Sequence, residues 1–314
     1  MPWGRRRLRK GLLDLASRPP ALLPLLRIYG RFRGTLRGLG LLRLAGLERA
    51  DGLLPQTLES PVPAGHHRPV QRPRGHVALF TGCLGRQLDA RAQRAALELL
   101  LRLGFEVSVP EQACCCGALH RHDGFAAEAQ RQLEASSQLF VRADYDAVLT
   151  LASACSGELQ RSPQLGPRTR DITRFLAELE WPDWLRLQPL RQQALIHVPC
   201  SQRNLLHDPE AAFDLLGRLP GLTLAPLPDN STCCGGAGTY MLREPRLSQA
   251  LLDDKVRHLR ELTPTLLITS NTGCALQLAA GLRRAGLATE VCHPVELIVR
   301  QLPSLDPPPS VLHN

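Results

Sequence analysis

The sequence has 314 residues, of which 44% are hydrophobic and 21% are charged, and this is an ordinary globular composition. The length exceeds one average domain, and together with the composition it excludes a disordered chain, a collagen and a small disulfide-stabilised scaffold. The formal charge is +9, but residues 1–50 hold 12 Lys and Arg against two acidic residues, so residues 51–314 sum to −1. We therefore expect a basic arm on a nearly neutral globule, and no fold-wide surface for nucleic acid.

Residues 1–54 are predicted to form a basic helical arm. Asp14 and Arg18 interrupt its first apolar residues and Pro19-Pro20 ends them, which does not match a signal peptide. Between residues 21 and 47 an arginine recurs every few positions, so no stretch approaches the ~20 apolar residues of a membrane span. Amphipathic basic helices suit an anionic membrane face or an acidic partner. The alternative is a solvated arm that packs on the rest of the chain.

Two proline-rich segments enclose the remaining sequence. Residues 55–75 contain five prolines and are predicted to be a linker. The His66-His67 pair in this linker is expected to be solvated, with a metal site as the alternative. Residues 303–314 include three consecutive prolines, cannot continue a helix, and are expected to be a frayed tail.

The sequence between these segments repeats once. Residues 76–155 align with residues 193–274, and the offset between matching positions stays between 117 and 119. A spacing of this size is too long for a solenoid repeat and indicates a duplicated domain. We predict two homologous domains, at residues 76–185 and 193–302.

Each copy alternates short apolar strands with helices. The expected strands are Val77–Phe80, Phe105–Val109, Ala147–Leu151, Leu195–Val198, Leu222–Leu227, Leu266–Thr269 and Thr289–Cys292, and the expected helices are Arg86–Leu103, Phe125–Val141, Glu210–Leu219 and Arg246–Leu262. Such strands indicate parallel sheets that are covered on both faces. The predicted fold class is therefore α/β, with two tandem homologous cysteine-rich domains that contain short parallel sheets, plus the basic helical arm.

Eight of the ten cysteines occupy equivalent positions in the two copies, and each follows a predicted strand. They are Cys83, Cys115, Cys116 and Cys155 in the first copy, and Cys200, Cys233, Cys234 and Cys274 in the second. Because the loops after parallel strands emerge at one edge of the sheet, we expect each copy to bring four thiols together. Cys114 and Cys292 have no counterpart. We expect Cys114 to be a spectator and His293 to be a helix-entry residue, with a ligand role as the alternative.

Four thiols in turn-rich loops favour an iron–sulfur cluster. Structural disulfides need an oxidising compartment, and nothing in the sequence supports export. Zinc is one alternative, although the Cys-x-x-Cys pairs typical of structural zinc sites are missing, and buried free thiols are another. Gly117, Gly235 and Gly236 are predicted to let the backbone approach a bulky inorganic core. Asn271 is a candidate hydrogen-bond donor to that core.

The Cys-Cys-Gly modules resemble the cysteine-rich domain of the heterodisulfide reductase family. They resemble more closely the iron–sulfur subunit of bacterial glycolate oxidase and the related lactate-utilisation iron–sulfur proteins. The resemblance covers about residues 70–302 and is most specific at residues 233–240 and 269–278. No cysteine precedes Cys83, so the ferredoxin module of those glycolate oxidase subunits is expected to be lost or to lie on a separate polypeptide. The fifth thiol of the heterodisulfide reductase pattern is missing in both copies, which argues against disulfide-cleaving chemistry.

The resemblance implies an iron–sulfur electron-transfer subunit with one or two [4Fe–4S] clusters. An FAD-containing partner subunit would oxidise glycolate or lactate, and this chain would pass the electrons towards a quinone-type acceptor. It also implies a cytoplasmic location, at the inner face of the membrane if the arm makes contact there, and a ferredoxin-type subunit as a further partner. The alternatives are a heterodisulfide-reductase-like thiol/disulfide oxidoreductase and a degenerate structural subunit without a cluster.

Overall fold

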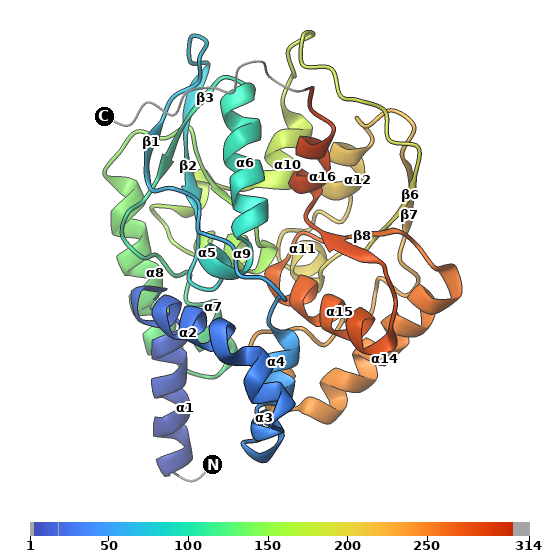
Figure 1. Ribbon diagram of the computed structural model, residues 1–314. Coiled ribbons are helices and arrows are strands. Elements are labelled where there is room, and N and C mark those ends of the chain that lie inside the picture. Colours follow the sequence, from blue (N-terminus) through green and yellow to red (C-terminus); the bar gives the residue numbers. More distant parts are fainter. Residues whose placement is uncertain (1–2, 18, 304–314) are drawn as a thin grey trace.

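The computed structural model describes residues 3–17 and 19–303 (Figure 1). The tail that the sequence predicts to fray, residues 303–314, lies outside the described residues apart from Pro303. The described chain consists of two α/β halves, each built on its own sheet, and a set of helices formed by the arm. The predicted α/β fold class with short parallel sheets is confirmed.

The first sheet has five strands in the order β1-β3-β2-β4-β5. They are β1 (Gly65–His67), β2 (Gly75–Phe80), β3 (Phe105–Val109), β4 (Ala147–Thr150) and β5 (Thr169–Asp171). Strands β2 to β5 run parallel, whereas β1 pairs antiparallel with β3. The prediction of a linker over residues 55–75 is therefore wrong at β1. Prolines flank β1 and do not enter it, and an edge strand needs backbone donors on one side only.

The second sheet has four parallel strands in the order β7-β6-β8-β9. They are β6 (Gln193–Ile196), β7 (Thr223–Pro226), β8 (Leu266–Ile268) and β9 (Glu290–Cys292). This order is the same as β3-β2-β4-β5 in the first sheet. The repeat in the sequence therefore produces one topology twice.

Helices follow the strands in both halves. In the first half they are α5 (Gly85–Leu88), α6 (Ala90–Arg102), α7 (Ala118–His122), α8 (Ala126–Val141), α9 (Ser153–Leu159), a 3₁₀ turn at Gly166–Arg168 and α10 (Ile172–Glu178). In the second half they are α11 (Cys200–Asn204), α12 (Ala211–Leu216), α13 (Tyr240–Arg243), α14 (Pro245–Leu262), α15 (Thr272–Ala285) and α16 (Pro294–Arg300). The single helix expected at Arg86–Leu103 is interrupted at Asp89, whose φ of −115° and ψ of 23° are not helical. Its carboxylate accepts a hydrogen bond from Thr272 of the other half, a contact that the local sequence does not indicate.

The two halves pack through reciprocal pairs of helices. Helix α6 of the first half contacts α16 of the second, and α10 of the first half contacts α12 of the second (Figure 1). Because α6 and α12 both follow the first strand of the repeat, and α10 and α16 both follow the last, the interface has the form of a two-fold arrangement. One buried apolar cluster runs through both halves, including Leu99, Leu176, Leu216 and Ile298.

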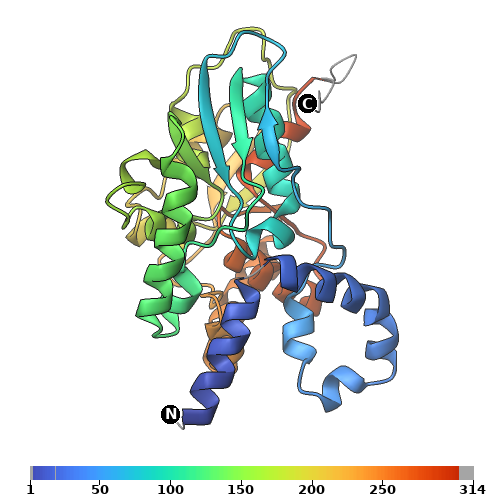
Figure 2. The same ribbon diagram turned by 90° about the vertical axis from the view of Figure 1, so that its left-hand side faces the viewer.

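The arm contains α1 (Trp3–Ala16), α2 (Pro19–Gly38), α3 (Leu41–Leu44) and α4 (Glu48–Leu53), and it projects from one side of the molecule (Figure 2). Within the described residues, no helix combines the length and the apolar character that crossing a bilayer would require.

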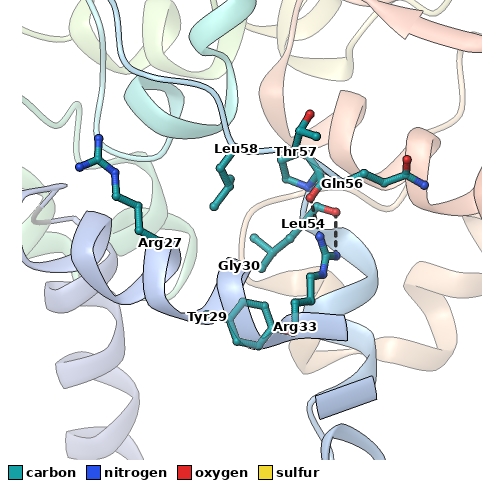
Figure 3. Close-up of a pocket in the computed structure, with 9 residues that line it drawn as sticks. Arg27, Tyr29, Gly30, Arg33, Leu54, Gln56, Thr57 and Leu58 are labelled. Atoms are coloured by element: carbon teal, nitrogen blue, oxygen red, sulfur yellow. Dashed lines mark hydrogen bonds between the residues drawn. The ribbon is translucent and has the colours of Figure 1, made fainter. Parts of the chain in front are cut away.

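The arm folds on itself around the buried carboxylate of Asp51. Arg33 and Arg37 each donate to this carboxylate from Nε at 2.6 Å, and Tyr29 donates from its hydroxyl. Burial raises the pKa of Asp51, but the hydrogen bonds from Tyr29, Arg37 and Arg33 outweigh it and hold that pKa below its usual value. Arg33 also donates to the carbonyl oxygen of Leu54, at the edge of a hollow that this part of the arm encloses (Figure 3). Part of the positive charge of the arm is therefore used to shape the arm itself.

Candidate metal centre

The eight repeated cysteines lie where parallel strands end, at one edge of each sheet. In the first half, Cys83 follows β2, the pair Cys115-Cys116 follows β3, and Cys155 lies in the first turn of α9 after β4. In the second half, Cys200 begins α11 after β6, the pair Cys233-Cys234 follows β7, and Cys274 lies in the first turn of α15 after β8. Each set therefore comes from three loops that the sheet topology brings together.

In the first half the four thiols form a continuous row, which we call the first thiol row (Cys83, Cys115, Cys116 and Cys155). The sulfurs of Cys83 and Cys115 lie 3.4 Å apart, and those of Cys116 and Cys155 lie 3.2 Å apart. Cys115 and Cys116 are hydrogen-bonded to each other and join the two pairs. Cys155 is half-buried and the other three are buried. The structure therefore brings the four predicted ligands of this half into contact.

The second thiol row (Cys200, Cys233, Cys234 and Cys274) has the same order of contacts. Cys200 is hydrogen-bonded to Cys233, Cys233 to Cys234, and Cys234 to Cys274. Cys234 and Cys274 are buried, while Cys200 and Cys233 are half-buried. Two sites with the same thiol connectivity thus occur in one chain.

The second thiol of each row, Cys115 or Cys233, has a lowered pKa. Hydrogen bonding with Cys116 and Cys83 holds the pKa of Cys115 well below its usual range. Hydrogen bonding to Cys115 is the main cause that raises the pKa of Cys83 and of Cys116. Cys233 occupies the same position in the second row, and its flanking thiols lower its pKa in the same way. A thiolate is the form of cysteine that binds metal, and the lowered pKa favours this form at one position of each row.

The glycine after each cysteine pair allows its loop to press against a helix. Gly117 and Gly235 adopt φ values of +87° and +79°, a region that favours glycine. A Cβ atom on Gly235 would lie 2.5 Å from the carbonyl oxygen of Ser248 in α14. One on Gly117 would lie 2.5 Å from the carbonyl oxygen of Ala129 in α8. These matching contacts show that α8 and α14 are equivalent helices of the two halves, and they hold each cysteine pair against its helix.

Gly236 and Asn271 support the start of α15. A Cβ atom on Gly236 would lie 2.7 Å from the carbonyl oxygen of Gly273, so the loop rests on the backbone of the helix. Oδ1 of Asn271 accepts hydrogen bonds from the backbone N–H groups of Gly273 (3.0 Å) and Cys274 (3.4 Å), which orients Cys274. Nδ2 of Asn271 donates to the hydroxyl of Ser153 in the other half at 3.3 Å. Contact of either residue with a cofactor stays a prediction.

His197 is a candidate ligand that the sequence analysis did not single out. It is buried at the end of β6, and one of its ring nitrogens lies within 4.8 Å of the sulfurs of Cys234 and Cys274. Burial, followed by the charge of Lys255, lowers the pKa of His197 to about 3, so the ring is neutral at physiological pH. Phe80 occupies the equivalent position in the first half. This difference between the two copies, Phe80 in the first and His197 in the second, is the sequence signal that could have identified His197.

Lys255 is a second difference between the two sites. Its side chain is fully buried on α14, and its Nζ donates to the carbonyl oxygen of Asp229 at 2.5 Å. Burial lowers the pKa of Lys255, while Asp229 and the thiols of Cys234 and Cys233 act in the opposite direction. With Ser248 aligned to Ala129, the counterpart of Lys255 on α8 is Ser136, whose hydroxyl accepts from the backbone N–H of Cys115 at 3.0 Å. The second row therefore lies near a cation, where the first has a neutral hydroxyl.

The remaining cysteines and His293 lie outside the two rows. Cys114 is buried with its sulfur 3.8 Å from the hydroxyl of Thr81, and Cys292 is buried in the apolar cluster shared by both halves. His293 has the predicted helix-entry position: its Nδ1 accepts from the backbone N–H of Val295 at 3.2 Å, and its Nε2 lies 3.0 Å from the carbonyl oxygen of Leu151.

The arm packs against the segments that follow both cysteine pairs. The carboxylate of Asp123, just after α7, accepts from Nε of Arg9 at 2.5 Å, from the hydroxyl of Thr239 at 2.6 Å and from Arg243 at 2.9 Å. The side chain of Asp123 is 1% exposed, so this junction of the arm with both halves is buried. The arm therefore packs on the rest of the chain at this junction, and contact of its other helices with a membrane stays a prediction.

Two further arm residues reach the loops that carry the thiols. Arg49 of α4 donates to the hydroxyl of Ser248 at 3.1 Å, and Ser248 in turn donates to the carbonyl oxygen of Gly235. The Ser17 hydroxyl is buried and, among the described residues, has no partner at normal hydrogen-bond distance. It lies close enough to Cys115 to contribute to the lowered pKa of that thiol. Neither residue could be linked to these loops from the sequence, because the arm is distant from them along the chain.

Comparison with protein families places these sites in a known domain. A sequence model of the cysteine-rich domain called CCG matches residues 77–160 and again residues 194–279, which together make up more than half of the chain. The chain belongs to the CCG cysteine-rich domain family. Each matched CCG domain contains one complete thiol row.

Curated relatives show similarity of the same kind. Lactate utilization protein A of Geobacillus sp. (strain WCH70) is 30% identical over 240 residues, which cover 71% of this chain and 98% of that protein. The probable glycolate oxidase iron-sulfur subunit of Bacillus subtilis (strain 168) is 28% identical over 295 residues, covering 83% of this chain and 66% of that protein. Among solved structures, an aspartate racemase homologue from Pyrococcus horikoshii OT3 aligns with a TM-score of 0.30 and 11% identity, over 72% of this chain and 95% of that chain.

Proposed function

We propose that each CCG domain holds one [4Fe–4S] cluster through its thiol row. The donor set supports this assignment, because four cysteine sulfurs from three loops are the usual protein ligands of such a cluster. The backbone N–H of Gly235 also donates to the sulfur of Cys233 at 3.3 Å, and hydrogen bonds to sulfur are a common feature of iron–sulfur sites. The zinc alternative predicts a different metal content, and metal analysis distinguishes the two.

On this basis, the chain acts as an iron–sulfur electron-transfer subunit of a complex that oxidises glycolate or lactate. The observation that carries this proposal is the pair of four-thiol rows within two CCG domains. The names of the relatives, which refer to lactate utilisation and to a glycolate oxidase iron–sulfur subunit, supply the substrate class. Oxidation of the acid would take place on an FAD-containing partner, with a separate ferredoxin-type subunit as a further partner and a quinone as the acceptor.

The arm supports a location in the cytoplasm at the inner face of the membrane. On α2, Leu25, Ile28 and Phe32 are all more than half exposed and share one face at helical spacing. Arg27 and Arg31 are exposed beside them. An apolar stripe flanked by arginines is the pattern that binds an anionic membrane surface. Contact through α2 would hold the complex close to a quinone acceptor.

The residues of this chain would hold, shield and tune the electron carriers. A bound cluster supplies one-electron transfer, and its potential depends on burial, hydrogen bonds to sulfur and nearby charge. The glycine loops and α8 and α14 exclude water from the inner side of each row. The hydroxyl of Ser17 lies near Cys115, and Lys255 provides positive charge near the second row. The second site is therefore expected to bind an added electron more strongly than the first.

Deletion of the gene for this chain tests the proposed function. Membranes from the deletion strain should lose glycolate- or lactate-dependent reduction of a quinone analogue, and the wild-type gene should restore it. A gene with Cys115→Ser and Cys116→Ser should not restore it, whereas Cys114→Ser should, because Cys114 lies outside the thiol row. Normal oxidation of both acids by the deletion strain would contradict the proposal.

Reduction of a disulfide by the purified chain with an artificial reductant would favour the thiol/disulfide oxidoreductase alternative.

A further inference from the structure

Three metal-ligating side chains converge on the first sheet at a distance from the cysteines. His66 lies on β1, Glu106 on β3 and His76 on β2, which are neighbouring strands. One ligand atom from each of the three side chains lies within 4.8 Å of the other two. Nε2 of His66 is 3.3 Å from Oε2 of Glu106. His66 lies in β1 and is exposed, and a metal site is the alternative that the sequence leaves open for the His66-His67 pair.

Strand register places these side chains on one face of the sheet. His66 pairs with Ser108 across β1 and β3, and His76 pairs with Glu106 across β2 and β3. Glu106 and Ser108 are two residues apart on β3 and therefore point to the same side. Val107, between them, points to the opposite side and is fully buried in the core. His66, His76 and Glu106 therefore lie on the same face of the sheet, opposite to the face that carries Val107.

We propose that His66, His76 and Glu106 form a zinc(II) site. Two imidazole nitrogens and one carboxylate oxygen, with water in the fourth position, are a ligand set that zinc accepts. Zinc–ligand bonds of ~2.0–2.1 Å in a tetrahedron require ligand atoms ~3.3 Å apart, and the His66–Glu106 separation of 3.3 Å already has this value.

Neighbouring groups hold the two rings in place. The hydroxyl of Ser108 lies 2.9 Å from Nε2 of His76 and 3.3 Å from Nδ1 of His66. The ring of Tyr145 packs edge-on against His76, with the ring centres 4.8 Å apart. Partners of this kind commonly orient histidine ligands, so binding zinc would require only a small movement of the rings.

This site is separate from the thiol rows. His76 lies at the beginning of β2, whereas Cys83 follows the end of the same strand. The four strand steps from His76 to Phe80, at ~3.3 Å each, already separate the two sites by about 13 Å. Zinc bound here would tie β1, and with it the segment that connects the arm to the first CCG domain, to the centre of the sheet.

Equilibrium dialysis of the cluster-loaded protein against micromolar zinc(II) tests the proposal, because the loaded thiols do not compete for zinc. We expect one zinc per chain in addition to the iron, and an at least tenfold weaker affinity after His76→Asn or Glu106→Gln. His67→Asn is the matched control: His67 points to the other face of β1, and its Nε2 lies 3.0 Å from the carbonyl oxygen of Pro63. This control should bind zinc as the wild type does.

Cobalt(II) provides a second readout, since a nitrogen and oxygen site gives d–d bands without thiolate charge-transfer bands. The variants should keep the wild-type iron content and circular dichroism. If His76→Asn or Glu106→Gln fails to fold, His66→Asn on the edge strand β1 replaces it as the ligand variant. The proposal is wrong if the wild type binds no additional zinc, if the ligand variants bind it normally, or if His67→Asn weakens binding equally. These outcomes leave the proposed electron-transfer function unaffected, because that function depends on the thiol rows.

Discussion

At the scale of single residues, the turn after each cysteine pair requires a residue without a side chain. Gly235→Ala should destabilise the protein by about 3 kcal/mol, because it adds backbone strain to a clash with the carbonyl oxygen of Ser248 at 2.5 Å. The same substitution should lower the iron content of the second site. Gly124→Ala is the control, since Gly124 also has a positive φ of +81° but an added Cβ would meet nothing within 4 Å. It should cost about 1 kcal/mol in urea denaturation. Equal costs for both variants would contradict the close approach of loop and helix.

The two lysines of the chain provide a matched test of charge near the second thiol row. Lys255→Gln should lower the midpoint potential of one cluster by about 60 mV, because the loss of a buried positive charge costs ~1.4 kcal/mol at an effective dielectric constant near 20. Lys10→Gln removes the same charge from the arm, where the side chain is 36% exposed and pairs with Asp14, and should leave both potentials unchanged. Redox titration followed by EPR measures this difference. Equal potentials in wild type and Lys255→Gln would show that Lys255 does not tune the site.

At the scale of elements, the arm is joined to both CCG domains through Asp123. Asp123→Ala should reduce the free energy of unfolding by about 2–3 kcal/mol, because it leaves partly buried arginine and threonine donors without their acceptor. Asp254→Ala on α14 is the control, because the Asp254 side chain is 62% exposed and its partner Arg257 is 3.7 Å away. This substitution should cost less than about 0.5 kcal/mol. If the two variants unfold alike, the arm is not held as the structure indicates.

The elements also show which features the sequence could predict. Apolar runs and helical periodicity were sufficient to predict β2, β3, β4 and the long helix α8, because these signals lie within each segment. The break at Asp89 and the strand β1 were missed, because the first depends on Thr272 in the other half and the second on pairing with β3. The cysteines were predicted to be ligands from their repetition. His197 and Lys255 were not, because their importance comes from proximity to the thiols in space.

At the scale of the molecule, duplication explains both the similarity of the two halves and their difference. The repeated sequence predicts one topology twice, and the two sheets have the same order of parallel strands. The reciprocal packing of α6 with α16 and of α10 with α12 could not be predicted, because an apolar helix face does not specify its partner. We retain residues 76–185 and 193–302 as the proposed domain limits.

The central claim is that the two thiol rows hold two iron–sulfur clusters, and anaerobic metal and sulfide analysis of the reconstituted chain tests it most directly. Two [4Fe–4S] clusters correspond to about eight iron and eight sulfide per chain. Combining Cys115→Ser with Cys116→Ser should halve both values, and EPR of the reduced protein should then show the second cluster alone. Reconstituted protein that contains zinc without sulfide, or no metal, would contradict the account.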